Sequence, residues 1–177
     1  MKKEKHIEFS RHPERYRFKK WLDNNALKVL SEVGIVEGDN ILDFGSGTGT
    51  YTIPAAKLVG VYGRVYALDV NQKDLKELEN RSKKAGLDNI FKLISSGNSK
   101  ISLPDRVLDH VLLIDVLHDI SDKIGLLNEV NRILKPGGIV TIYPMHIQVE
   151  DVVNIASVSN LKLKEKKFQE RLLLFKK

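Results

Sequence analysis

The sequence of 177 residues contains no cysteine, two methionines and one tryptophan. The absence of cysteine excludes a disulfide framework, a thiolate nucleophile and any zinc or iron–sulfur site built on cysteine. No apolar run approaches the roughly 18 residues that a membrane-spanning helix needs. The start, MKKEKHIEFS, is basic, but no apolar segment follows it, so no secretory signal is expected. The sequence therefore predicts a cytoplasmic protein without a membrane span.

The net charge of +6 is distributed unevenly along the chain. Residues 1–20 contain eight Lys or Arg and three Glu, and residues 161–177 contain seven Lys or Arg and two Glu. Each end therefore carries +5, which leaves −4 on the residues between them. Basic ends can attract an anionic partner such as RNA or an acidic metabolite. Surface lysines can equally keep a protein soluble and protect an edge strand from pairing. The charge distribution alone therefore does not decide between these two interpretations.

Predicted strands and helices alternate along the chain. A mobile basic arm, 1–12, is expected to precede one domain, 13–177, whose first helix begins at Pro13 and ends at Gly34. The seven predicted strands are 40–44, 64–70, 90–94, 109–115, 139–143, 161–168 and 171–176. The helices predicted between them are 50–59, 72–85, one that begins at a Ser121 cap and ends at 135–138, and 150–158.

This alternation predicts an α/β fold: a mostly parallel sheet of seven strands with helices on both faces. Only Gln169 and Glu170 separate the last two predicted strands. Two residues are too few for a crossover connection, so these strands must pair antiparallel at the C-terminus.

The strongest local signal is the segment DFGSGTG, 43–49, between a predicted strand and a predicted helix. Glycines let the backbone turn tightly and approach a ligand where a Cβ would clash. Asp69 ends the next predicted strand, where a carboxylate can accept hydrogen bonds from both hydroxyls of a ribose. The loop and this acid together predict a cofactor that contains a nucleoside.

The spacing of the glycines argues against a dinucleotide. The dinucleotide pattern G-x-G-x-x-G/A requires Gly or Ala at the third position, where Thr50 or Thr52 stands in the two possible frames. Asp43, just before the loop, disfavours a pyrophosphate and suits a cationic amino-acid group. The pattern favours a ligand with an amine and a sulfonium over a nicotinamide or flavin.

With these residues in place, the chain resembles the class I S-adenosylmethionine-dependent methyltransferases, in particular the ubiquinone/menaquinone-like group that acts on small molecules. Four segments carry the resemblance: ILDFGSGTGTYT (41–52), VYALDV (65–70), LDHVLLIDVLHDI (108–120) and NEVNRILKPGGIV (128–140). The resemblance spans about residues 13–177 and implies a Rossmann-like fold with a reversed final strand pair. It specifies the fold and the cofactor, S-adenosyl-L-methionine, but not the acceptor.

The resemblance also implies roles for individual residues. The implied cofactor set is Asp43, Gly45, Ser46, Gly47, Gly49, Asp69, Val70, Asn98 and Asp115. Asp43 would lie near the methionine end of the cofactor, Asp69 would hold the ribose, and Asp115 would lie near the sulfonium. Asn98 stands where the family usually has an acid that contacts the adenine amine, and its amide oxygen can accept the same hydrogen bond.

Methyl transfer from a sulfonium needs a base only when the acceptor is a poor nucleophile. His118 and Asp115 are the candidate catalytic residues for that task, although His118 is equally well explained as a packing residue of the loop. Tyr143 or His146 is a candidate acceptor contact. The aromatic and basic residues before the first strand either close over the site or serve as core contacts, as Phe18 and Trp21 would.

Other chemistries and other function classes are weighed against this one. No carboxylate or histidine cluster shows metal-ligand spacing, so no metal site is expected. No Asn/Asp-Pro-Pro-aromatic motif for nucleic-acid bases is present. The alternatives to an enzyme acting on a small molecule are an RNA or protein methyltransferase that uses the basic ends, and a binding module without turnover. The oligomeric state stays open.

Overall fold

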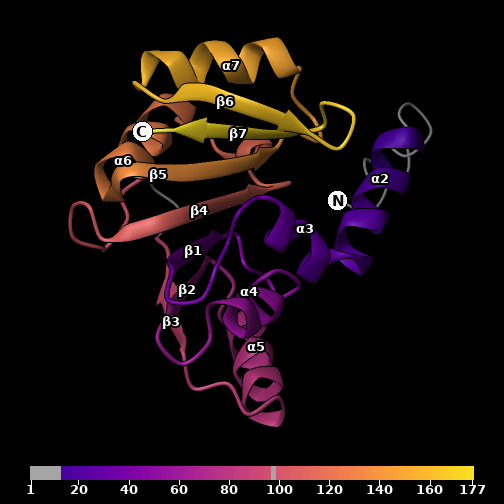
Figure 1. Ribbon diagram of the computed structural model, residues 1–177, viewed down its shortest axis with the longest axis vertical. Coiled ribbons are helices and arrows are strands. Elements are labelled where there is room, and N and C mark those ends of the chain that lie inside the picture. The colour runs from indigo at the N-terminus through magenta and orange to yellow at the C-terminus, as the bar shows by residue number, and fades with distance from the viewer. Residues whose placement is uncertain (1–12, 97–98) are drawn as a thin grey trace.

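The computed structural model describes residues 13–96 and 99–177 (Figure 1). The predicted arm, 1–12, and the candidate Asn98 lie outside the described residues. The strands are β1 (Asn40–Phe44), β2 (Arg64–Asp69), β3 (Ile90–Ile94), β4 (Leu108–Ile114), β5 (Leu134–Tyr143), β6 (Lys162–Lys167) and β7 (Leu172–Lys176). The helices are α2 (Pro13–Asn24), α3 (Ala26–Glu32), α4 (Thr52–Val59), α5 (Gln72–Lys84), α6 (Lys123–Ile133) and α7 (Val149–Val158), with a 3₁₀ turn, η1 (Leu117–Asp119).

The seven strands form one sheet in the order β3-β2-β1-β4-β5-β7-β6. β1 to β5 pair in parallel, and β7 pairs antiparallel with both β5 and β6. This arrangement confirms the predicted fold class, including the reversed pair at the C-terminus. The central strands β1 and β4 lie side by side, but their connections lead to opposite halves of the sheet, which is where ligands bind in such folds.

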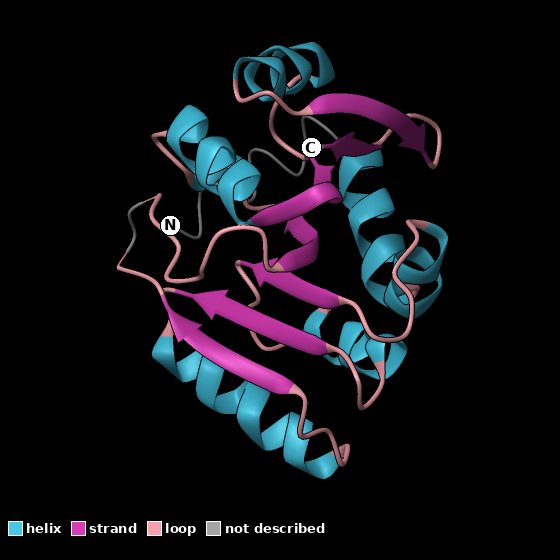
Figure 2. Cartoon of the chain, turned by 60° about the vertical axis from the view of Figure 1, so that its left-hand side comes forward, coloured by secondary structure: helices cyan, strands magenta, loops and turns pink. Residues whose placement is uncertain are grey.

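Helices cover both faces of the sheet (Figure 2). On one face, buried residues of α6 and α7 such as Val130 and Val152 pack with Val111 of β4. On the other face, α3 and α4 pack against Ile41 and Leu112. Leu112 follows Val111 directly along β4, so the two side chains point to opposite faces of the sheet. A strand in such a sheet is buried on both sides, which explains the nearly continuous apolar run of β4.

Three local predictions were wrong at element boundaries. The first helix divides at Asn25, whose side-chain amide donates to the carbonyl oxygen of Trp21 at 2.8 Å; such a bond competes with the helical backbone. Asp122, not Ser121, caps α6, because its carboxylate accepts from the Gly125 backbone N–H at 2.8 Å. The fifth strand was predicted to begin at 139, after a turn at 135–138. β5 begins at Leu134 instead, because Leu134 is buried and pairs with Leu108 of β4.

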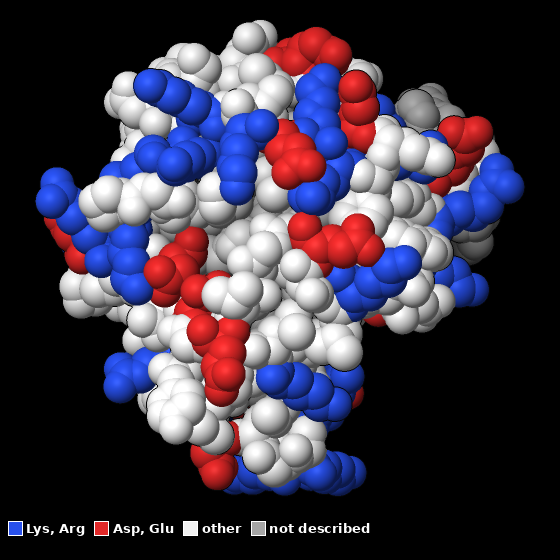
Figure 3. Space-filling view, viewed as in Figure 1, with Lys and Arg blue, Asp and Glu red and all other residues white. Residues whose placement is uncertain are grey.

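The basic C-terminal end lies on an edge of the sheet. β6 is the outermost strand, and four of its six residues are lysines with exposed or half-buried side chains. Figure 3 shows Lys and Arg gathered over β6 and β7 with acidic residues among them. Lysines on an exposed edge prevent pairing with a further strand, which supports the structural interpretation of this charge. In the described part of the chain, no helix has the length and apolar character needed to cross a bilayer.

Candidate functional site

The candidate site residues lie along the edge of the sheet formed by the carboxyl ends of the parallel strands. The glycine loop follows β1, Asp69 ends β2, Asp115 follows β4, and His146 lies three residues beyond β5. A cavity of about 360 Å³ opens at this edge. Of the predicted residues, Gly45, Asp69, Val70 and Asp115 line the cavity.

The glycine loop is a tight turn that two of its glycines make possible. Gly45 and Gly49 have φ angles of 77° and 92°, in the region that residues with a Cβ rarely adopt. A Cβ on Gly45 would stand 2.7 Å from Val116 Cγ2, and a Cβ on Gly49 would stand 2.4 Å from Leu78 Cδ1. Both approaches are too short for carbon atoms, so the backbone comes this close to its neighbours only because these residues are glycine.

We expect Gly49→Ala to destabilise the protein more than Gly34→Ala does. Both glycines have a positive φ, 92° and 96°, but nothing lies within 4 Å of a Cβ on Gly34. Backbone strain of about 1–3 kcal/mol is therefore common to both variants, and the contact with Leu78 affects only Gly49. Denaturant unfolding of the two variants measures the difference, and equal losses would contradict the packing argument.

Asp69 lines the cavity and also accepts a hydrogen bond from the glycine loop. Its Oδ2 accepts a hydrogen bond from the Gly47 backbone N–H at 2.7 Å, and its Oδ1 accepts one from Asn71 N–H at 2.8 Å. A carboxylate has about four acceptor positions, so two remain for the hydroxyls of a ligand. Asp69 therefore couples the position of the glycine loop to the residue predicted to bind a ribose.

Asp43 lies beneath the loop, not on the cavity wall. It is buried, and its Oδ2 accepts a hydrogen bond of 2.6 Å from the Thr52 hydroxyl. Burial raises the pKa of Asp43 to about 6, and the nearby charge of Asp69 acts in the same direction. Thr52, which breaks the dinucleotide pattern, is thus the partner of this acid.

Within the described structure, the buried Ser46 hydroxyl finds no hydrogen-bond partner.

Three ionisable side chains meet beside the cavity: Asp115, His118 and His146, named here the Asp–His–His cluster. Asp115 Oδ1 lies 3.8 Å from His118 Nδ1 and 3.6 Å from His146 Nε2. The two imidazole rings lie 4.3 Å apart, centroid to centroid. Asp115 has a φ of 58°, and burial raises its pKa.

Sequence spacing did not reveal this cluster. Asp115 and His118 are neighbours along the chain, but His146 follows a different strand, after a helix and β5. The register of β4 on β5 brings them together, because Ile114 pairs with Tyr143 and the Asp115 backbone N–H donates to the Tyr143 carbonyl at 3.2 Å. The signal available in the sequence was that both residues follow predicted parallel strands.

Helix α2 packs onto the same edge. The Tyr143 hydroxyl donates to the Arg15 carbonyl at 2.9 Å, and Arg15 Nη1 donates to the Met145 carbonyl at 2.8 Å. Tyr16 presents its ring edge-on to His146, with centroids 6.3 Å apart. Of the two predicted core contacts, Phe18 packs on Tyr143 with ring centroids 5.5 Å apart, whereas Trp21 stacks on Phe18 at the surface and is 37% exposed. The first helix therefore both packs on the domain and lies beside the site.

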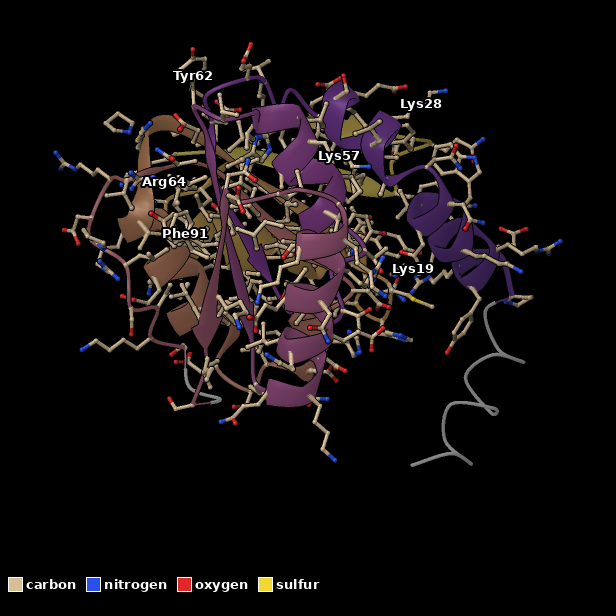
Figure 4. All side chains as sticks on the ribbon, turned by 90° about the horizontal axis from the view of Figure 1, so that it is seen from below. Lys19, Lys28, Lys57, Tyr62, Arg64 and Phe91 are labelled. Atoms are coloured by element: carbon tan, nitrogen blue, oxygen red, sulfur yellow. The ribbon has the colours of Figure 1, made fainter. Side chains whose placement is uncertain are left out.

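A second cavity lies at the opposite ends of the strands. It measures about 470 Å³ and is lined by residues before and at the starts of β2 and β3, among them Arg64, Asn89 and Phe91. In Figure 4, Arg64, Phe91 and Tyr62 lie on one side of the molecule, away from Lys19 on α2. None of the predicted site residues lines this larger cavity.

Comparison with known proteins identifies similar sequences. A family model described as "Methyltransferase domain" matches residues 42–142, more than half of the chain. The chain is 36% identical over 111 residues to the demethylmenaquinone methyltransferase of Geobacillus stearothermophilus, which is 63% of this chain and 47% of that protein. The protein of that name from Staphylococcus aureus (strain JH9) is 33% identical over 113 residues, 64% of this chain and 46% of its own. The chain spans about half the length of these curated relatives.

Solved structures share the fold over a larger part of the chain. A SAM-dependent methyltransferase from Aquifex aeolicus has a TM-score of 0.77 at 26% identity, over 92% of this chain and 97% of that chain. Phosphoethanolamine N-methyltransferase 2 of Haemonchus contortus, solved with S-adenosyl-L-methionine, has a TM-score of 0.69 at 22% identity, over 78% and 37% of the two chains. At that identity, the second likeness shows the fold alone.

Proposed function

The chain belongs to the methyltransferase-domain family of class I S-adenosylmethionine-dependent enzymes, and from this premise we propose that it methylates a small-molecule acceptor. The observation that carries the proposal is the glycine loop, hydrogen-bonded to Asp69 at the rim of a cavity of about 360 Å³. This is the arrangement that a nucleoside-containing cofactor requires at the carboxyl ends of parallel strands. Relatives whose names specify demethylmenaquinone support a small molecule as the acceptor.

The residues present fit S-adenosylmethionine. Gly45 lines the cavity without a side chain, so its backbone can approach a ligand closely, and the buried Ser46 hydroxyl is available as a donor or acceptor. Asp69 keeps acceptor positions for ribose hydroxyls, and Val70 next to it offers an exposed apolar surface to a base. When bound, this cofactor supplies an electrophilic methyl group on a sulfonium leaving group.

The protein's own contribution is to position the acceptor and to exclude water. Asp115 lines the cavity, His118 lies beside Asp115, and α2 reaches the same cluster through the contact of Tyr16 with His146. An acceptor hydroxyl or acidic carbon must lose a proton as it reacts, and His118 is the candidate base. Asp115 Oδ1 lies 3.8 Å from Nδ1 of this histidine.

We expect His118→Ala to lower turnover without changing the dissociation constant for S-adenosylmethionine. General bases contribute typically 10²–10⁴-fold to rate, and His118 is not among the residues that line the cofactor cavity. Steady-state kinetics and calorimetry on the same preparation separate the two quantities. Unchanged turnover would leave His118 a purely structural role.

The cofactor claim is tested by calorimetric titration of the purified protein with S-adenosylmethionine, S-adenosylhomocysteine and NAD. We expect micromolar binding of the first two and none of NAD. Transfer of a labelled methyl group to a panel containing demethylated quinols, phenols and amines then tests the acceptor class. Binding without turnover on any acceptor would favour a regulatory module. Transfer to RNA whose rate falls steeply with salt would favour a nucleic-acid acceptor.

A further inference from the structure

We propose that the Asp–His–His cluster binds a divalent transition-metal ion. One ligand atom from each of Asp115, His118 and His146 lies within 4.8 Å of the others. Nitrogen ligands around a tetrahedral zinc ion stand about 3.3 Å apart, given bonds of about 2.0–2.1 Å. Small rotations of half-buried side chains are enough to close the remaining distance.

The contacts within the cluster are too long to satisfy the Asp115 carboxylate. The separations of 3.6 Å and 3.8 Å between Asp115 Oδ1 and the two imidazoles exceed hydrogen-bond length. Within the described structure, Asp115 Oδ1 is buried and has no hydrogen-bond partner. A buried carboxylate oxygen without a donor is unfavourable, and a cation between the three groups would remove that penalty.

The outer contacts orient the ligands for a metal. His118 Nε2 lies 3.3 Å from Asp119 Oδ1, so a proton on Nε2 leaves the lone pair of Nδ1 directed toward Asp115. A carboxylate behind a metal-binding histidine is the common supporting arrangement. Lys19 of α2 is the cation whose charge acts most strongly on Asp115. It already forms an ion pair with Asp23, with 2.7 Å between Nζ and Oδ1.

The donor set selects the class of ion. Two imidazole nitrogens and one carboxylate oxygen suit Zn²⁺, Co²⁺, Mn²⁺ or Fe²⁺, whereas Mg²⁺ and Ca²⁺ prefer oxygen alone. The side chains of Asp115, His118 and His146 are 23%, 28% and 18% exposed, so the ion can enter and keep open positions for water or substrate.

The location gives the ion a role that rests on the proposed function. Asp115 lines the cofactor cavity, so an acceptor hydroxyl bound to the ion would lie at the mouth of that cavity. A divalent cation lowers the pKa of a hydroxyl bound to it. With the ion bound, His118 is its ligand and no longer the base, so the O–H bond breaks with the proton passing to water, and the oxygen keeps its electron pair as the nucleophile. This role predicts an acceptor that offers a hydroxyl oxygen.

Calorimetric titration of the untagged protein with ZnCl₂, in the absence of cofactor and acceptor, tests the site. We expect one ion per chain with micromolar or tighter affinity, and at least tenfold weaker binding in His118→Ala, His146→Ala and Asp115→Asn. The control variant His6→Gln/His12→Gln changes the two histidines outside the described residues and is expected to bind as the unmodified protein does. MgCl₂ is expected to give no binding in the same range.

Three results would overturn the site: no zinc binding, equal binding in His146→Ala, or loss of binding in the control variant. Nuclear magnetic resonance of the unmodified protein removes any dependence on variant folding, since Mn²⁺ should broaden the ring signals of His118 and His146 before that of the buried His110. Zinc binding without methyl transfer would refute the proposed function and leave the site intact. Methyl transfer unaffected by a chelator would refute the role of the ion.

Discussion

Asp69→Ala is expected to weaken the binding of S-adenosylmethionine by about 1.5–3 kcal/mol, or roughly 10- to 150-fold, the scale of a hydrogen bond to a charged group. Two effects add. The variant removes the carboxylate predicted to accept from the ribose hydroxyls. It also removes the 2.7 Å hydrogen bond that holds Gly47 N–H, so the glycine loop loses its support.

Two variants separate these effects. Asp69→Asn keeps one amide oxygen for Gly47 N–H but loses the charge and one acceptor, so its affinity should fall between those of the parent and Asp69→Ala. Glu77→Ala removes an exposed carboxylate of α5, outside the residues that line the cavity, and should leave affinity unchanged. Calorimetry at constant salt gives the three constants. An unchanged constant in a folded Asp69→Ala protein would refute the ribose assignment.

The residues that could be predicted from the sequence are those whose function depends on local order. Gly45 and Gly49 stand between a strand and a helix, and the structure shows that each is required by a close neighbour, Val116 or Leu78. Asp69 could be identified because a strand end fixes the position of its last residue relative to the preceding loop. The β4 run was predicted within one residue because burial on both faces leaves a continuous apolar signal.

The features that the sequence did not reveal depend on contacts that residue spacing alone does not specify. His146 meets Asp115 only through the pairing of β4 with β5, and a one-residue slip of that register would separate them. The break in the first helix at Asn25 depends on a side-chain hydrogen bond to the Trp21 carbonyl, which competes with the backbone hydrogen bonds of the helix. Asp122 caps α6 because its carboxylate accepts from the Gly125 N–H, although Ser121 next to it is also a good cap type.

Asp43→Asn is expected to stabilise the protein above pH 6 while weakening the binding of cofactor. Burial raises the pKa of Asp43 from its usual value of 3.8 to about 6, so ionising this group at higher pH destabilises the folded state. Asparagine has the same shape and its side-chain oxygen can still accept from Thr52. A shift of about two pKa units corresponds to about 2–3 kcal/mol, which sets the expected gain in the free energy of unfolding at pH 8.

The pH dependence follows from the direction of the shift. The folded protein holds the proton more tightly than the unfolded chain, so the gain from Asp43→Asn is complete above pH 6 and disappears as the pH falls toward 3.8. Denaturant unfolding at pH 8 and pH 5 measures it, and equal gains at both values would contradict the assigned pKa.

The Asp43→Asn substitution, which is expected to raise stability, is expected to lower the affinity for the cofactor. A cationic ligand favours the ionised carboxylate, so binding to the unmodified protein should weaken about tenfold between pH 7 and pH 5, one unit below the pKa of Asp43. Asp43→Asn should bind less tightly at pH 7 and lose this component of the pH dependence. Binding explains a buried acid that costs stability beneath a ligand loop, since stability alone would favour the amide. If Asp43→Asn gained stability with no loss of affinity at pH 7, the acid would have no part in holding the cofactor.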